Sequence, residues 1–177
     1  MDHKAIDIFG WIHTGGEARG DLQLAQMERL ASLLADAAGT LSWEARGWVE
    51  RAIGGDEAMM LQLHATARPL LTCSNCLEPV AVDLAFDRTL RIVADEVSAA
   101  RLDELDPEID AIAGSRHFDL LELIEDEAIL ALPPLARHDQ CAPPGPLRDD
   151  GDDQEDQPTG SLAALASLMK GGGSGVQ

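Results

Sequence analysis

Hydrophobic and polar residues alternate in two long segments of the chain, a pattern typical of β-strands with one buried face. The first segment covers residues 60–71, and its apolar positions are Leu61, Leu63, Ala65 and Ala67. The second begins at residue 80, and its apolar positions are Val80, Val82, Leu84 and Phe86. The short CSNCLEP segment between them predicts an antiparallel hairpin. The apolar run TLRIVAD then predicts a continuation of the second strand past a bend.

A third strand is predicted over residues 41–53, and a GGD turn follows it. Its apolar positions are Trp43, Ala45, Gly47 and Val49. The acidic segment 96–115 contains Pro107 and Gly114, and it predicts a long connection with one short helical piece.

Two segments carry apolar residues at helical spacing. In 22–38, Asp21 can cap the helix and Gly39 can end it, and the apolar stripe holds Leu24, Met27, Ala31 and Leu34. The segment 119–132 gives the clearest helical pattern, with an apolar side formed by Leu120, Leu121, Ile124, Ala128, Ala131 and Leu132. Its opposite side is acidic and holds Asp119, Glu122, Glu125 and Asp126. The two prolines that follow end the helix.

These elements predict an α+β fold: an antiparallel β-sheet, open or curled into a partial barrel, with the two helices packed on or beside it. With 177 residues, 45% of them hydrophobic, the chain can bury one core, and we expect a single domain over residues 1–142. The composition then shifts to Pro, Gly and Asp, which predicts a disordered acidic linker over 143–177. Residues 162–169 form a short apolar motif that is expected to become ordered only against a surface. Its apolar positions at helical spacing are Leu162, Leu165, Ala166 and Met169.

The charge of the chain narrows the choice of partners. There are 13 Lys and Arg residues against 32 Asp and Glu, which gives a net charge of −19. Such a field repels phosphate backbones, and the aromatic residues that stack on bases are few. Direct nucleic-acid binding is therefore not expected, whereas a basic protein partner fits the charge. The amino-terminal residues show no leader pattern and no apolar run approaches the ~18 residues of a membrane span, so we expect a cytoplasmic protein without a membrane partner.

The three cysteines are too few for a secreted disulfide framework. Cys73 and Cys76 have the spacing that lets two thiolates reach one tetrahedral ion, and His138 and Cys141 supply a second such pair. We therefore expect a Cys₃His structural zinc site that ties the hairpin turn to the segment after the last helix. A thioredoxin-like redox pair is the less favoured alternative, because Pro79 and renewed alternation follow the motif where a helix should begin. Unliganded thiols remain a further alternative, because the two pairs lie far apart in the sequence.

Nothing in the sequence assembles a nucleophile, a base and an oxyanion donor. The acidic side of the 119–132 helix resembles paired catalytic carboxylates, but such residues usually form the solvated face of an amphipathic helix. His64 lies on the polar side of a strand and is interpreted as a surface histidine. We therefore expect a protein that is not an enzyme.

Taken together, TCSNCLEPV, then FDLLELIEDEAILALPPLARHDQC, and finally SLAALASLMK resemble the YceD family of large ribosomal RNA subunit accumulation proteins. The resemblance implies a non-enzymatic factor that supports synthesis, processing or stability of large-subunit (23S) ribosomal RNA. It places the family's cysteine knuckle on Cys73 and Cys76, its acidic helix on 119–132, and its downstream ligand segment on His138 and Cys141. Where the family commonly has Arg before the second cysteine, this chain has Asn75.

The function favoured at this point is an acidic adaptor in ribosome assembly, which holds a basic ribosomal protein or a maturation factor through the acidic helix and the 162–169 motif. The alternative is a metal-dependent hydrolase that acts on precursor ribosomal RNA through Glu122, Glu125 or Asp126. Direct RNA binding through a basic patch formed in the fold is a third hypothesis. The carboxy-terminal segment could also be a solubilising extension alone.

Overall fold

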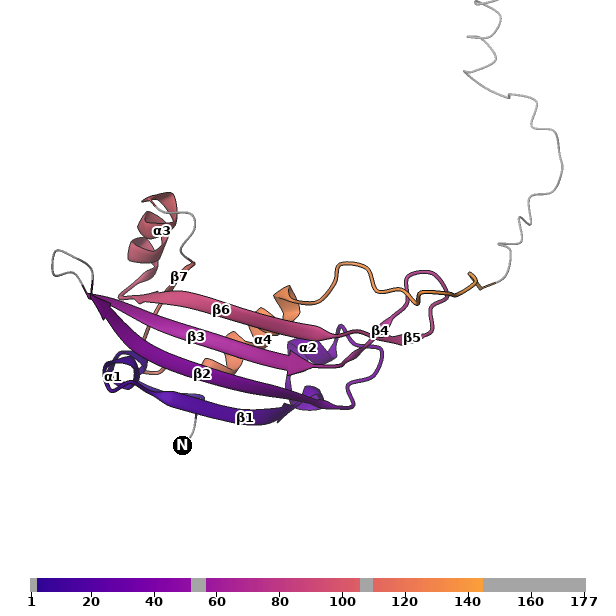
Figure 1. Ribbon diagram of the computed structural model, residues 1–177, viewed down its shortest axis with the longest axis horizontal. Helices are drawn as coiled ribbons and strands as arrows, with labels where there is room; N and C mark the ends of the chain where they lie inside the picture. Colours follow the sequence, from indigo (N-terminus) through magenta and orange to yellow (C-terminus); the bar gives the residue numbers. More distant parts are fainter. Residues whose placement is uncertain (1–2, 52–56, 106–109, 145–177) are drawn as a thin grey trace, which may run out of the picture. The chain divides into compact units, whose positions relative to one another are not determined.

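The computed structural model describes residues 3–51, 57–105 and 110–144 (Figure 1). In chain order its elements are α1 (Ile8–His13), β1 (Glu17–Gln23), the 3₁₀ turn η1 (Leu24–Gln26), α2 (Glu28–Ala31), β2 (Thr40–Arg51), β3 (Glu57–Ala67), β4 (Leu70–Thr72), β5 (Pro79–Ala81), β6 (Leu84–Val93), α3 (Glu96–Leu105), β7 (Ala111–Ala113) and α4 (Leu120–Leu130). Five strands form one sheet in the order β1-β2-β3-β6-β7, and β4 pairs with β5 in a separate hairpin. All pairs are antiparallel except β6–β7, and the large sheet is open, with β1 and β7 at its edges. The α+β prediction is confirmed.

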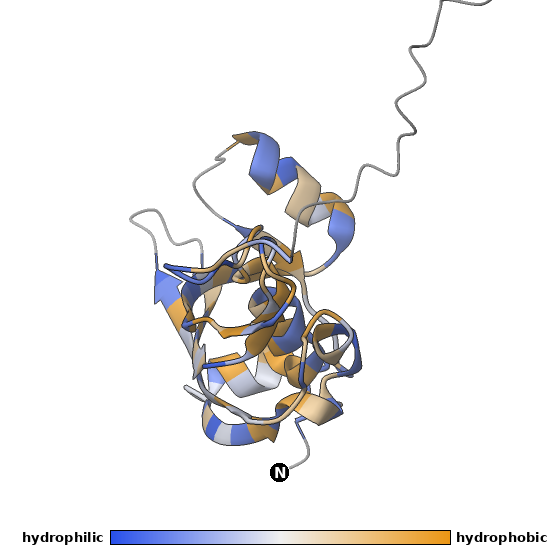
Figure 2. Ribbon diagram, turned by 90° about the vertical axis from the view of Figure 1, so that its right-hand side faces the viewer, coloured by the Kyte–Doolittle hydropathy of each residue, from blue (hydrophilic) through white to orange (hydrophobic). Residues whose placement is uncertain are grey.

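The core lies between one face of the sheet and the helices α1, α2 and α4. Alternating residues of the central strands point into it: Leu41, Trp43, Ala45, Leu61, Leu63, Ala65, Leu84 and Phe86. The helices contribute Ile8, Ile12, Leu30, Leu120, Ile124 and Ala128. Figure 2 shows hydrophobic residues gathered between the sheet and the helices packed against it. The opposite face of the sheet carries polar side chains such as His64, which is why its strands alternate so regularly.

The predicted helix over 22–38 is wrong. Residues 17–23 form strand β1, in which Leu22 lies opposite Leu41 on β2. Asp21 caps no helix there, because its side chain accepts a 2.6 Å hydrogen bond from the Ser42 hydroxyl. Helical structure in the rest of the segment is limited to η1 and the one-turn helix α2, which bury Leu24 and Leu30. The apolar spacing of three residues misled the prediction because it suits a 3₁₀ turn as well as a long helix. Residues 17–23 pair instead with the free edge of β2.

The predicted strands over 41–53 and 60–71 are confirmed as β2 and β3, although the chain leaves the large sheet after Ala67. Pro69 cannot donate to a strand ladder, and its carbonyl instead accepts a 3.0 Å hydrogen bond from the amide of Val82. The predicted hairpin is therefore split: β3 pairs with β6, while the cysteine turn is carried by the smaller β4–β5 hairpin. The bend falls before Leu84, and the first five residues of TLRIVAD belong to an unbroken β6 that ends at Val93.

The predicted helix over 119–132 is confirmed as α4, whose N-cap is Asp119. The short helical piece expected in 96–115 is α3. Helix α1 and strand β7 were not predicted, since six and three residues are too few to show a period. The predicted acidic linker beyond residue 144, with Leu162, Leu165, Ala166 and Met169, lies outside the described residues. Within the described part of the chain, no helix has the length and apolar character needed to cross a membrane.

Candidate functional site

The four predicted metal ligands meet at the end of the β4–β5 hairpin. Cys73 directly follows β4 and Cys76 lies in the turn before β5, while His138 and Cys141 come from the segment after α4. Their ligand atoms all lie within 4.8 Å of one another. Cys73 is fully buried, and Leu71, Val80 and Ala136 join it in a small hydrophobic cluster. The fold therefore brings together two pairs of residues that are separated by more than sixty positions.

Two ligand-to-ligand distances in this cluster match a tetrahedral metal centre. With Zn–S bonds of about 2.3 Å and a Zn–N bond of about 2.0–2.1 Å, tetrahedral ligands are separated by about 3.8 Å for two sulfurs and about 3.6 Å for sulfur and nitrogen. The Sγ atoms of Cys73 and Cys141 are 3.8 Å apart. The Sγ atom of Cys76 lies 3.4 Å from Nδ1 of His138. The residues present thus fit a four-coordinate ion.

The imidazole of His138 is oriented for this role by its second nitrogen. Nε2 lies 3.2 Å from the carbonyl oxygen of Pro79, an acceptor, so Nε2 carries the proton. In the neutral imidazole Nδ1 then carries no proton, and it is Nδ1 that faces the sulfur of Cys76. Metal-binding histidines are typically held in this way by a carbonyl or carboxylate on the far side of the ring.

Asn75 contributes to the cluster in a way that the sequence did not reveal. Its side-chain amide donates hydrogen bonds to the carbonyl oxygen of Cys141 at 3.0 Å and to its sulfur at 3.1 Å. The neighbouring Ser74 donates from its amide to the carbonyl of Ala136 at 2.9 Å. These bonds join the hairpin turn to the segment after α4 independently of a metal. Residues between two cysteines are natural candidates for such contacts, but only the fold shows their partners.

Two thiols of the cluster, those of Cys73 and Cys76, have pKa values displaced in opposite directions. The backbone amide of Cys76, helped by further hydrogen bonds, lowers the pKa of the Cys73 thiol to about 5 despite its burial. The pKa of Cys76 is raised: the amide of Glu78 lowers it, but burial and the neighbouring Cys73 and Cys141 outweigh that effect. Since the thiolate is the metal ligand, Cys73 is prepared to bind a cation near neutral pH. The arrangement does not resemble a thioredoxin-like redox pair, because strand β5 follows the motif rather than a helix.

The acidic residues of α4 divide into structural and exposed ones. Glu125 was expected on a solvated face, but its side chain is only 13% exposed. One carboxylate oxygen accepts hydrogen bonds from the backbone amides of Arg29 and Leu30 at 2.8 and 3.0 Å, and the other lies 3.2 Å from the Arg29 guanidinium. Asp126 forms an ion pair with the same guanidinium. Glu125 therefore links α4 to α2, and the expectation of a solvated position was wrong for this residue.

The remaining acidic candidates on α4 lie at its start. Asp119 accepts hydrogen bonds from the amides of Leu121 and Glu122, each at 3.0 Å, and so caps the helix. The side chain of Glu122 is exposed. Among the described residues, the side chains close enough together to hold a metal ion are those of the Cys–His cluster. The carboxylates of α4 do not form such a group there.

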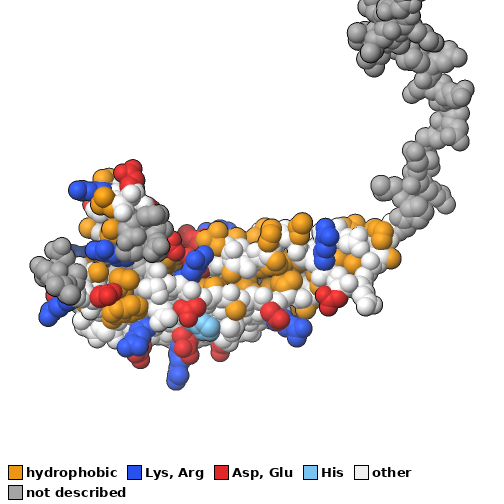
Figure 3. All heavy atoms as spheres, turned by 45° about the horizontal axis from the view of Figure 1, so that its top comes forward, with side chains coloured by type: hydrophobic (Ala, Val, Ile, Leu, Met, Phe, Trp, Pro, Cys, Tyr) orange, Lys and Arg blue, Asp and Glu red, His pale blue; other side chains and the backbone are white. Residues whose placement is uncertain are grey.

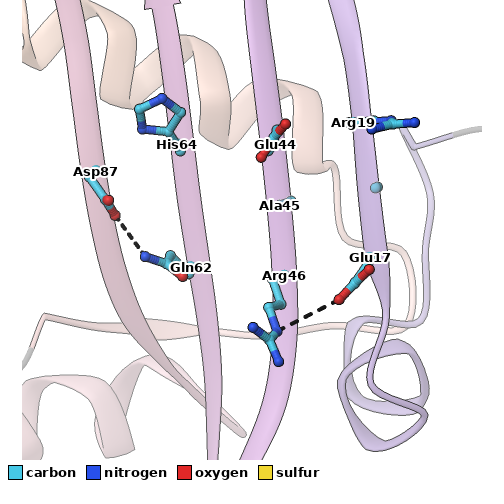
Figure 4. A pocket seen from close by; sticks show the side chains of 9 residues that line it. Glu17, Arg19, Glu44, Ala45, Arg46, Gln62, His64 and Asp87 are labelled. Carbon is cyan, nitrogen blue, oxygen red and sulfur yellow. Dashed lines mark hydrogen bonds and ion pairs between the residues drawn. The ribbon is translucent and has the colours of Figure 1, made fainter.

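A polar groove of about 790 Å³ runs over the open face of the sheet (Figure 4). One row of its side chains crosses four strands, because Arg19, Glu44, His64 and Asp87 are successive cross-strand neighbours. The adjacent row pairs Glu17 with Arg46 at 3.7 Å, and Gln62 donates a 3.0 Å hydrogen bond to Asp87 (Figure 4). The groove carries both charge signs side by side. His64 is exposed and lines this groove, in agreement with its interpretation as a surface histidine.

A model of the family described as large ribosomal RNA subunit accumulation protein YceD matches residues 61–169. This range contains the Cys–His cluster, helix α4 and the 162–169 motif. Comparison with curated proteins and with solved structures found no significant match.

Proposed function

Because the chain belongs to the YceD family of large ribosomal RNA subunit accumulation proteins, we propose that it supports large-subunit (23S) ribosomal RNA as a non-enzymatic acidic adaptor. In this role it holds a basic large-subunit ribosomal protein or a maturation factor. The observation that carries the adaptor role is the charge balance of 13 basic against 32 acidic residues. Complementary charge speeds the encounter with a basic partner and selects against other acidic molecules, including RNA.

The distribution of charge supports a protein partner over a nucleic acid. On the face drawn in Figure 3, basic side chains are scattered singly and acidic ones lie near them. Several basic residues are also engaged in ion pairs, as Arg29 is with Glu125, Arg46 with Glu17 and Arg51 with Glu57. Phosphate backbones are bound by clusters of free Lys and Arg side chains.

The Cys–His cluster is proposed to hold one structural zinc ion. Three sulfurs and one nitrogen fill all four positions of a tetrahedron, so the site is of the closed, structural kind rather than the catalytic kind with an open position. When bound, the ion would tie the β4–β5 hairpin to the segment after α4. Exposed Glu122 on that helix, together with residues 162–169, remains the proposed contact with the partner.

The adaptor role is tested by recovering the tagged, full-length protein from its own cells at increasing salt, with and without ribonuclease. We expect a basic large-subunit protein to be retained at low salt, to be lost as salt screens the contact, and to resist ribonuclease. Deletion of the gene is expected to lower 23S relative to 16S ribosomal RNA. Retention that depends on intact RNA would contradict the adaptor role, and unchanged 23S levels would contradict the role in ribosomal RNA accumulation.

The hydrolase alternative is tested by an RNA-cleavage assay with the same purified protein. Incubated with precursor ribosomal RNA and Mg²⁺ or Mn²⁺, it is expected to leave the RNA intact. Cleavage that disappears in Glu122→Gln would overturn the non-enzymatic proposal; Glu122 is the informative position because Glu125 and Asp126 have structural contacts.

A further inference from the structure

A second hollow lies where β6, β7, α3 and α4 meet, away from both the Cys–His cluster and the groove of Figure 4. Its volume is about 390 Å³, and its walls include Asp103 from α3, Asp110 at the start of β7, and Glu127 from α4. Arg88 of β6 also faces it. The hollow therefore combines three carboxylates with one guanidinium, and its charge is more one-sided than that of the groove over the open sheet face.

Glu127 is the unusual residue of this hollow. Only 9% of its surface is exposed. Among the described residues, it is the polar or charged residue that counts as buried. Its Oε2 atom lies 3.2 Å from Nε of Arg88, yet it receives no hydrogen bond of good geometry. A buried carboxylate usually has its oxygens fully hydrogen-bonded, so Glu127, which lines the hollow, is an under-satisfied acceptor.

Arg88 only partly neutralises the carboxylates around it. Its guanidinium is shared with Asp110, whose carboxylate lies 3.8 Å away. The pKa of Glu127 is raised because burial, together with Asp110 and Asp126, outweighs the lowering effect of Arg88. A second cation in the hollow would relieve this repulsion.

Apolar side chains line the hollow beside its charged groups, which distinguishes it from a site for a hydrated metal ion. Leu90, Ile112 and Leu130 line it, and Leu130 is 70% exposed although it belongs to a well-packed helix. An arginine side chain matches both features, because its aliphatic stem can cover Leu130 while its planar guanidinium donates to more than one carboxylate.

We infer that this hollow binds an arginine side chain presented by the basic protein partner, with Asp103, Asp110 and Glu127 as acceptors and Leu130 against the aliphatic stem. The inference rests on the proposed adaptor function and adds a second contact with the partner to the one proposed at Glu122 and residues 162–169. In contacts of this kind, one charged side chain inserted into a partly apolar pocket supplies much of the specificity.

The test is an NMR titration of the full-length protein with the peptide acetyl-Gly-Arg-Gly-amide. The peptide is expected to shift the methyl signals of Leu130 and Ile112, and the otherwise identical citrulline peptide is not. Asp103→Asn should weaken binding about tenfold, the loss of one charge-assisted contact. The control is Asp87→Asn, which makes the same charge change in the groove of Figure 4 and should leave the affinity unchanged.

Four results would overturn the inference: no shifts at these methyls, equal binding of the citrulline peptide, equal weakening by Asp87→Asn, or the same shifts from spermidine alone. The last result would identify a site for free amines rather than for a protein side chain. Failure here is distinguishable from failure of the adaptor role. If the peptide fails while the full protein still retains a basic ribosomal protein, only the anchoring site is wrong. If the peptide binds but no such protein is retained, the pocket stands and the adaptor role falls.

Discussion

At the scale of single residues, the cysteine turn contains a strained position. Leu77 follows Cys76 and has a φ of +66°, in the left-handed region that costs most L-residues roughly 1–2 kcal/mol. The turn is closed by two hydrogen bonds with Cys73, one from its amide to Glu78 and one from the amide of Leu77 to its carbonyl. The side chain of Leu77 is 65% exposed, so it gains little from burial in return.

Leu77→Gly is therefore expected to raise the free energy of unfolding by about 1 kcal/mol, since glycine adopts a positive φ without steric cost. Urea denaturation of both proteins, saturated with zinc, measures the change. The matched control is Leu135→Gly, an exposed leucine after α4 without a positive φ, which is expected to be neutral or destabilising. Equal effects of the two substitutions would show that the turn is not strained.

At the scale of elements, the short helix α2 depends on the long helix α4. A helix of four residues leaves all its first amide groups without partners, and α2 has no side-chain cap of its own. Glu125 of α4 supplies the missing acceptor for the amides of Arg29 and Leu30. The cap is thus provided by a residue almost one hundred positions away.

We expect Glu125→Ala to lower the free energy of unfolding by about 2–3 kcal/mol, because it removes charge-assisted hydrogen bonds and leaves two amides unsatisfied. Glu122→Ala on the same helix is the control and should change stability by less than about 0.5 kcal/mol. Chemical denaturation compares the two variants. Similar losses at both positions would mean that Glu125 contributes only as one more charge on the helix.

At the scale of the whole molecule, the described domain has two hydrophobic clusters of very different size. The large one lies between the sheet and its helices, while the small one has only Leu71, Cys73, Val80 and Ala136 as buried members. A cluster of this size rarely holds a hairpin by itself, and small cores are commonly completed by a metal. The Cys–His cluster sits within this small core.

Removal of the metal is therefore expected to loosen one end of the molecule rather than unfold all of it. Protein purified without chelator should contain one equivalent of zinc, and Cys76→Ser should lose it. In both the chelated protein and the variant, amide hydrogen exchange should accelerate over 70–82 and 132–141, while β2 and β3 remain protected. Absence of zinc, together with exchange that chelator does not alter, would leave the four residues as an ordinary polar cluster.

Local patterns in the sequence determined much of this protein. Period-two alternation located β2 and β3, helical spacing located α4, and the two short Cys and His motifs identified all four residues that meet in the cluster. These features depend on near neighbours in the chain, which a sequence displays directly. The α+β class followed from them.

Only the tertiary structure decided which segments pair and which polar side chains are structural. Residues 17–23 became a strand because β2 offered an open edge, although the following leucines also suit a helix. Glu125 and Glu122 are indistinguishable in sequence, yet one caps α2 and the other faces solvent. The partners of Asn75 and Glu127 likewise come from distant segments. Hydrogen bonds and burial of this kind depend on three-dimensional neighbours, and no local period encodes them.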